Sequence, residues 1–196
     1  MRQSFDSDWS NNYSDVRDDI VIEHKVPERF RHRGEGLAAA QAEAGLQGHE
    51  IRQDILELAD VPAPGDVAEQ LGIAAGETVF VRRRLVGVAD GPPLQLADSY
   101  IPLGLANDQI RCEDSGPGGT YARIEDQGHP IRRYQEQIVR QRAATADERE
   151  QLQLDDGKDL VIDFRRVAYA DAGPVECLVA VMAAGRHRFT YDVSAP

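Results

Sequence analysis

The stretch EQLGIAAGETVFVRRRLVGVADGPPLQL at Glu69–Leu96 recurs 81 positions later, without a gap, as EQLQLDDGKDLVIDFRRVAYADAGPVEC at Glu150–Cys177. Each copy contains the end of a helix, a glycine turn, an apolar strand, a tight turn and a return strand. Arg84 aligns with Arg165 between the two copies. An internal repeat predicts one sheet built from two related helix–hairpin halves, and the alternative is a chance similarity of two ordinary hairpins.

The composition describes an acidic chain of 196 residues with a formal net charge of −12. This charge argues against a chain that grips nucleic acid or anionic membranes, because basic patches bind both. There are two cysteines and no apolar run long enough to span a bilayer, so we expect a cytoplasmic protein with no membrane partner. The histidines lack metal-ligand spacing and no nucleotide-binding glycine motif is present, so we predict no metal site and no cofactor.

The elements outside the repeat continue the same pattern. The sequence predicts a short helix at 120–127, a strand at 132–141 and a final strand at 187–193. Thr145 and Glu148 form a capping box that opens the helix of the second copy. Consecutive hairpins with helices between them predict an α+β fold, with a mainly antiparallel sheet flanked by helices.

The chain divides into two parts on its composition. We expect residues 1–44 to be a leader or linker that is partly disordered, and residues 45–196 to form the domain. Within the domain, residues 51–59 fit either a strand or a helix, because the hydrophobic period does not distinguish them.

Residues 45–193 resemble the UTRA domain, the effector-binding domain of HutC-type regulators in the GntR family. The resemblance is carried by VAEQLGI with GETVFVRRRL, PLQLADSYIP, GGTYARIEDQG, RYQEQI, EREQLQL, FRRVAYADAGPVE and GRHRFTYDV. It implies a chorismate-lyase-like fold, a small-molecule pocket between sheet and helices, and a homodimer. Such regulators carry a winged-helix domain before this one. Residues 1–44 are too few to hold it, so we expect DNA contact only through a winged-helix domain not seen in this chain.

A cluster of arginines is the first candidate for ligand binding. Arg82 and Arg84 share one face of their predicted strand, because side chains alternate along a strand. Their guanidinium forks suit carboxylate or phosphate ligands. The alternative is a solvated strand face whose arginines pair with acidic residues across the sheet. Thr120 and Tyr121 follow two glycines where a helix begins, and free N–H groups there favour an anion. The alternative role of Thr120 is that of an N-cap.

The resemblance implies further site residues. It places pocket arginines on the strand of Arg84 and an anion contact at Thr120. It also implies that Glu136 and Glu176 face the pocket, unless each pairs with a structural arginine. Core packing is the alternative role of Tyr100 and Met182. The predicted effector-binding residues are Arg82, Arg84, Tyr100, Thr120, Tyr121, Glu136, Arg165, Glu176 and Met182.

The function predicted on these grounds is the sensing of a small anionic metabolite. Binding would shift the populations of two dimer arrangements and so change DNA binding by an attached or partner winged-helix domain. Two alternatives remain, a chorismate-lyase-like enzyme and a ligand-free dimerisation module. The sequence shows no nucleophile with an adjacent base, so we assign no catalytic residue.

Overall fold

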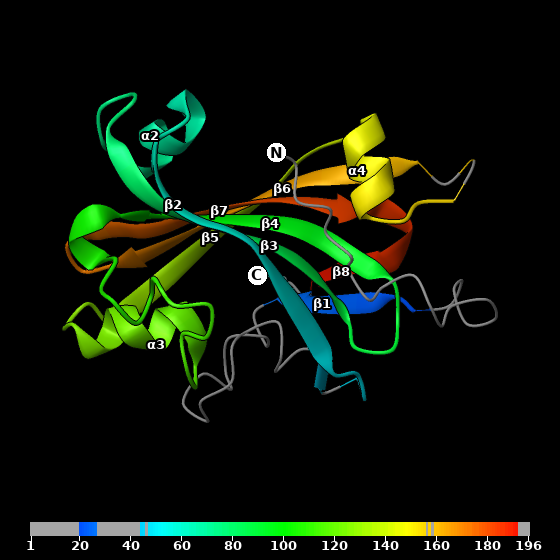
Figure 1. The fold of residues 1–196 in the computed structure, drawn as a ribbon, viewed down its shortest axis with the longest axis horizontal. Helices are drawn as coiled ribbons and strands as arrows, with labels where there is room; N and C mark the ends of the chain where they lie inside the picture. The colour runs from blue at the N-terminus through cyan, green and yellow to red at the C-terminus, as the bar shows by residue number, and fades with distance from the viewer. Residues whose placement is uncertain (1–19, 27–43, 46, 156, 158, 192–196) are drawn as a thin grey trace, which may run out of the picture.

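The computed structural model describes residues 20–26, 44–45, 47–155, 157 and 159–191. Most of the predicted leader at 1–44 therefore lies outside the described residues, and the predicted domain boundary stays a prediction. Figure 1 shows the described part as one twisted sheet with smaller elements on both of its faces.

The sheet has six strands in the order β2-β3-β4-β7-β6-β5, and every neighbouring pair is antiparallel. This arrangement confirms the predicted α+β fold with a mainly antiparallel sheet. The segment that fitted either a strand or a helix is a strand, because it pairs along its whole length with a central strand. The strands are β2 (Ile51–Pro62), β3 (Thr78–Val88), β4 (Pro93–Pro102), β5 (Ile131–Ala143), β6 (Leu160–Ala170) and β7 (Gly173–Ala183).

The strand order is symmetric about the pair β4–β7, as two related halves require. Asp98 on β4 lies opposite Val179 on β7, and these residues are one repeat length apart. The helix of each half, α2 (Gly65–Leu71) or α4 (Ala146–Gln151), lies on the same side of the sheet (Figure 1).

Local sequence signals set the ends of these two helices. Helix α2 ends at Gly72, whose left-handed φ of 66° suits a residue without a side chain. Helix α4 begins with the predicted capping box, in which Thr145 Oγ1 accepts from the Glu148 N–H and the Glu148 carboxylate accepts from the Thr145 N–H. Val67 of α2 and Leu152 after α4 are fully buried against the sheet, so this face is closed by apolar packing.

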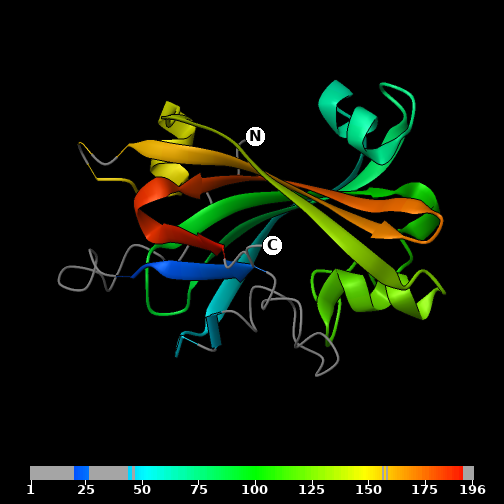
Figure 2. The ribbon, with the colours of Figure 1, turned by 180° about the vertical axis from the view of Figure 1, so that it is seen from behind.

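The other face of the sheet is covered at its two ends by different elements. At one end lie the short helices η3 (Leu103–Leu105) and α3 (Gly119–Asp126), the latter packing through Tyr121 and Ile124. At the other end β1 (Ile22–Val26) and β8 (His187–Tyr191), which follows η4 (Ala184–Arg186), form a parallel pair. Figure 2 shows the same two covers from behind the sheet. The middle of this face is left for a cavity.

The register of the strands corrects one detail of the repeat. Arg84 lies opposite Ala97 on β4, and Arg166 lies opposite Leu178 on β7. Ala97 and Leu178 are one repeat length apart, so Arg166 is the spatial counterpart of Arg84. The sequence alignment, which matches Arg84 with Arg165, is therefore out of register with the structure by one residue, because β6 begins 82 positions after β3 rather than 81. A slip of one residue moves every side chain of a strand to the opposite face.

Candidate functional site

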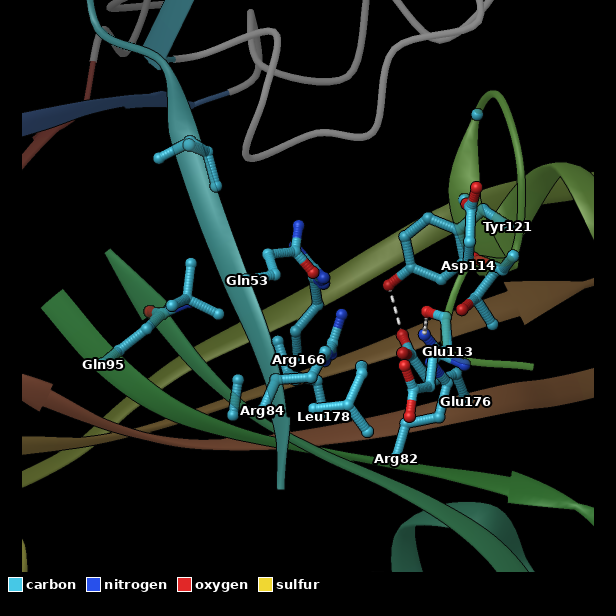
Figure 3. Close-up of a pocket in the computed structure, with 18 of the residues that line it drawn as sticks. Gln53, Arg82, Arg84, Gln95, Glu113, Asp114, Tyr121, Arg166, Glu176 and Leu178 are labelled. Atoms are coloured by element: carbon cyan, nitrogen blue, oxygen red, sulfur yellow. Dashed lines mark hydrogen bonds between the residues drawn. The ribbon is translucent and has the colours of Figure 1, made fainter. Parts of the chain in front are cut away.

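A cavity of about 380 Å³ lies on the sheet between α3 with its preceding loop and the β1–β8 pair. Figure 3 shows its side chains rising from several strands and from the loop before α3. From one end of the cavity to the other, along the direction of the strands, the side chains that line it change from charged to uncharged. Glu176 comes first on β7, the arginines of β3 and β6 follow, and Gln53 and Gln95 lie furthest from Glu176.

Arg82 holds the loop that forms one wall of the cavity. Its guanidinium donates to the carbonyl oxygens of Ile110 at 2.8 Å, Cys112 at 2.5 Å and Glu113 at 2.9 Å. Burial, followed by repulsion from Arg84, lowers the pKa of Arg82 to about 10. Arg82 lines the cavity as predicted, but its hydrogen bonds go to the protein, so it shapes the wall.

Arg84 and Arg166 bring two positive charges to the centre of the cavity. Arg84 donates to Ser99 Oγ at 2.5 Å, and its Nε has no hydrogen-bond partner among the described residues. Burial lowers the pKa of Arg84, Glu176 partly offsets this effect and Arg166 adds to it. The guanidinium of Arg166 lies 5.4 Å from the ring centre of Tyr121. Burial also acts to lower the pKa of Arg166, but Tyr121 and Glu176 outweigh it and the pKa is raised.

Glu176 is the buried carboxylate that faces these arginines. It is 2% exposed, and the Tyr121 hydroxyl donates to its Oε2, as the dashed line in Figure 3 marks. Burial raises the pKa of Tyr121 well above its usual value, and the negative charge of Glu176 adds to this, so the phenol stays a neutral donor. Glu176 is therefore the one buried carboxylate beside three guanidiniums, because Glu113 and Asp114, which also line the cavity, are exposed. The buried centre of the site has more guanidiniums than carboxylates although the chain is acidic.

The first turn of α3 faces the same positive centre. Gly118 and Gly119 have φ angles of 78° and 65°, which let the backbone turn sharply onto the helix and approach the cavity closely. Gly118 is the N-cap, so Thr120 lies inside the helix and the N-cap role considered for it is excluded. The first-turn N–H groups of a helix lack intrahelical acceptors and carry a positive partial charge, so this turn suits an anion.

The structure brings six of the nine predicted site residues to this cavity and places three elsewhere. Tyr100 packs on the opposite face of the sheet, where its hydroxyl donates to Asp98. Arg165 also points to that face and forms an ion pair with Asp66 of α2. Glu136 lies on the outer strand β5 and does not line the cavity. The six that line it are Arg82, Arg84, Thr120, Tyr121, Glu176 and Met182.

Seven polar residues of the cavity were not predicted from the sequence, namely His24, Gln53, Gln95, Glu113, Asp114, Ser115 and Arg166. The sequence alignment selected Arg165 instead of Arg166 because it is out of register by one residue, and the Arg165-Arg166 doublet was the only signal for Arg166. Gln53 lies in the segment whose secondary structure the pattern left open. Gln95 and His24 carry no motif, and only the packing of distant strands brings them together.

A second cavity, of about 510 Å³, lies on the opposite face and is lined half by leucine and valine and half by charged or polar side chains. Its guanidinium, that of Arg83, is paired with Glu57 at 2.7 Å and with Asp98 at 3.2 Å. Because these charges neutralise one another, this cavity has no uncompensated positive charge among its described residues that would attract an anion. We take the cavity of Arg84 and Arg166 as the candidate site.

Two features are absent from the part of the chain that the structure describes. Within this part of the chain, no helix is long and apolar enough to cross a bilayer. In the same residues, no group of three or more His, Cys, Asp and Glu side chains is arranged to hold a metal ion.

The fold and the cavity define a small-molecule-binding α+β domain, and comparison with known proteins identifies its family. The UTRA domain model matches residues 46–188, so the chain belongs to the UTRA domain family. It corresponds to the effector-sensing domain of a GntR-family transcriptional regulator, as the resemblance implied.

Individual relatives agree with this assignment. An uncharacterized HTH-type transcriptional regulator of Streptomyces coelicolor, SCO4628, is 28% identical over 171 residues, which cover 86% of this chain. The match spans 63% of that relative's length. The crystal structure of the PhnF C-terminal domain is 29% identical with a TM-score of 0.60, covering 75% of this chain and 91% of that one. PhnF from Mycobacterium smegmatis has a TM-score of 0.72 at 20% identity, covering 90% of this chain and 73% of that one, and shows the shared fold.

Proposed function

We propose that this domain senses a small anionic metabolite, which binds in the cavity between the sheet and α3. The observation that carries the proposal is that the guanidiniums of Arg84 and Arg166 lie in the same cavity as the first turn of α3. A buried guanidinium costs free energy unless an anion compensates it, and Glu176 is one carboxylate for several such groups. A carboxylate or phosphate would accept from both guanidinium forks and from the α3 N–H groups.

Neighbouring arginines on opposite faces allow a matched test of this site. We would screen the purified chain by thermal shift against phosphosugars, short carboxylates, amino-acid breakdown products, fatty acyl compounds and chorismate. A compound at about 100 times its Kd stabilises the fold by about 2.7 kcal/mol, or about 5–10 °C in Tm at this chain length. Arg166→Met should abolish that shift, whereas Arg165→Met should retain it, because Arg165 faces Asp66 on the other side of the sheet. Equal effects of the two substitutions would contradict the assignment of the site.

We infer that the domain binds its ligand without converting it. The polar groups around the cavity centre are guanidiniums, a carboxylate and a phenol kept neutral, and Ser99 has the guanidinium of Arg84 rather than a base beside its hydroxyl. Nucleophilic catalysis by serine needs an adjacent base. Incubation with chorismate should therefore yield no pyruvate, and turnover would support the enzymatic alternative.

The remaining parts of the proposal concern the assembly. We propose that the domain acts as a homodimer in the cytoplasm and that ligand binding alters the affinity of an associated winged-helix domain for DNA. The relatives that are transcriptional regulators support this proposal. Sedimentation analysis with and without a thermal-shift hit tests the dimer, and a monomer at micromolar concentration under both conditions would refute it.

A further inference from the structure

Strand β1 forms part of the wall of the cavity although it lies before the segment that matches the family model. It pairs in parallel with β8, and His24 lies opposite Phe189. The His24 side chain lines the cavity and is 7% exposed. The chain thus adds a side chain to the site from outside residues 46–188.

The ring of His24 is held in a defined orientation. His187 Nε2 lies 3.0 Å from the carbonyl oxygen of Leu94, which can only accept, so this nitrogen carries the proton. His187 Nδ1 is then the acceptor for His24 Nε2 at 2.8 Å. Burial lowers the pKa of His187 to about 3, so His187 stays neutral and retains this acceptor. The His24 ring is also stacked at 5.1 Å from His187 and 4.7 Å from Phe189.

The end of the cavity near β1 differs chemically from its centre. Gln53 on β2 and Gln95 on β4 flank Val86 of β3, so one row across the sheet carries two amide side chains. Arg84 lies two residues before Val86, which places this row about 7 Å further along the strands. The hydrogen-bonding side chains at this end are the two amides and the imidazole of His24, in contrast to the guanidiniums at the centre.

We propose that His24 is a specificity-determining residue of the effector site and that it selects anions carrying hydroxyl groups about 7 Å from the charged group. The inference rests on the proposed function, because the arginines must hold the anion. A ligand that contacts both the arginines at the centre and His24 near β1 connects the sheet to β1 through its own hydrogen bonds. Its binding therefore stabilises the docking of β1 on β8, whereas an anion that fills only the centre leaves β1 unaffected.

Two probes that share a phosphate group test this inference. Inorganic phosphate reaches the arginines alone, and glucose 6-phosphate adds hydroxyls that extend toward Gln53, Gln95 and His24. Calorimetric titration of the wild type should give tighter binding of glucose 6-phosphate by about tenfold or more, from two or more added hydrogen bonds. His24→Phe retains an aromatic ring beside His187 and Phe189 and should reduce this ratio about fivefold, with phosphate affinity unchanged. His49→Phe, which lies outside the cavity lining, is the control and should leave both affinities unchanged.

Hydrogen exchange gives a second readout that does not depend on a substitution. Glucose 6-phosphate should slow amide exchange in residues 22–26, whereas phosphate should not. The inference is overturned if phosphate binds but glucose 6-phosphate gains nothing, or if His24→Phe leaves the ratio unchanged. If neither anion binds, the proposed function itself fails, so the two failures are distinguishable.

Discussion

Replacing Glu176 by glutamine should lower stability and raise anion affinity at the same time. The substitution keeps an oxygen acceptor for the Tyr121 hydroxyl but removes the buried negative charge that faces Arg84 and Arg166. Removal of one partner from a buried charged network costs about 3–5 kcal/mol, and we expect about 3 kcal/mol because the hydrogen bond survives. At this chain length the loss lowers the Tm by about 6–12 °C.

The gain in affinity follows from the spacing of the strands. Glu176 lies two residues along β7 from Leu178, the partner of Arg166, so a bound anion at Arg166 is about 7 Å from this carboxylate. Two unit charges at that distance interact by about 2 kcal/mol at an effective dielectric constant of 20. Removing this repulsion should tighten phosphate binding by about 30-fold at low salt.

Two measurements on the same protein check the predicted loss of stability and the predicted gain in phosphate affinity. Thermal denaturation reports the stability of the unliganded chain, and calorimetric titration with inorganic phosphate reports the affinity. Glu69→Gln, on the exposed face of α2, is the matched control and should change neither quantity. Unchanged or weaker phosphate binding in Glu176→Gln would refute the reasoning, because it would mean that the anion does not bind beside this carboxylate.

Two further predictions concern the loop wall and helix α4. Arg82→Met should lower stability by about 3 kcal/mol through the loss of three charged hydrogen bonds, and proteolysis should become faster at residues 110–113; unchanged cleavage would show that Arg82 does not hold the loop. Glu148 accepts two 2.7 Å hydrogen bonds from Arg142, which hold its folded-state pKa at about 2, below the usual 4.5. Its contribution to stability is therefore present above pH 4.5 and lost as the pH falls toward 2. Glu148→Gln should flatten the stability profile in that window, whereas Glu150→Gln on the exposed side of α4 should not; urea denaturation at several pH values measures the difference.

The sequence was sufficient to predict the fold class because its signals are local. Hydrophobic alternation, glycine turns and the capping box each depend on residues a few positions apart, and they indicated the hairpins and the start of α4. The repeat indicated that the hairpins form related halves. The segment at 51–59 was the exception, because pairing with β3 decides its conformation.

The sequence by itself also determined which kinds of residue gather at the site, namely arginines on a strand, a glycine-led helix start and the carboxylate at 176. Only the tertiary structure decided which of them share the cavity. A single extra residue before β6 places Arg166 on the cavity face of the sheet and Arg165 on the opposite face. No local feature of the sequence distinguishes the two arginines. Likewise His24 reaches the cavity because β1 pairs with β8, at the far end of the chain. Contacts between strands so distant in sequence depend on register and packing, which the local pattern does not contain.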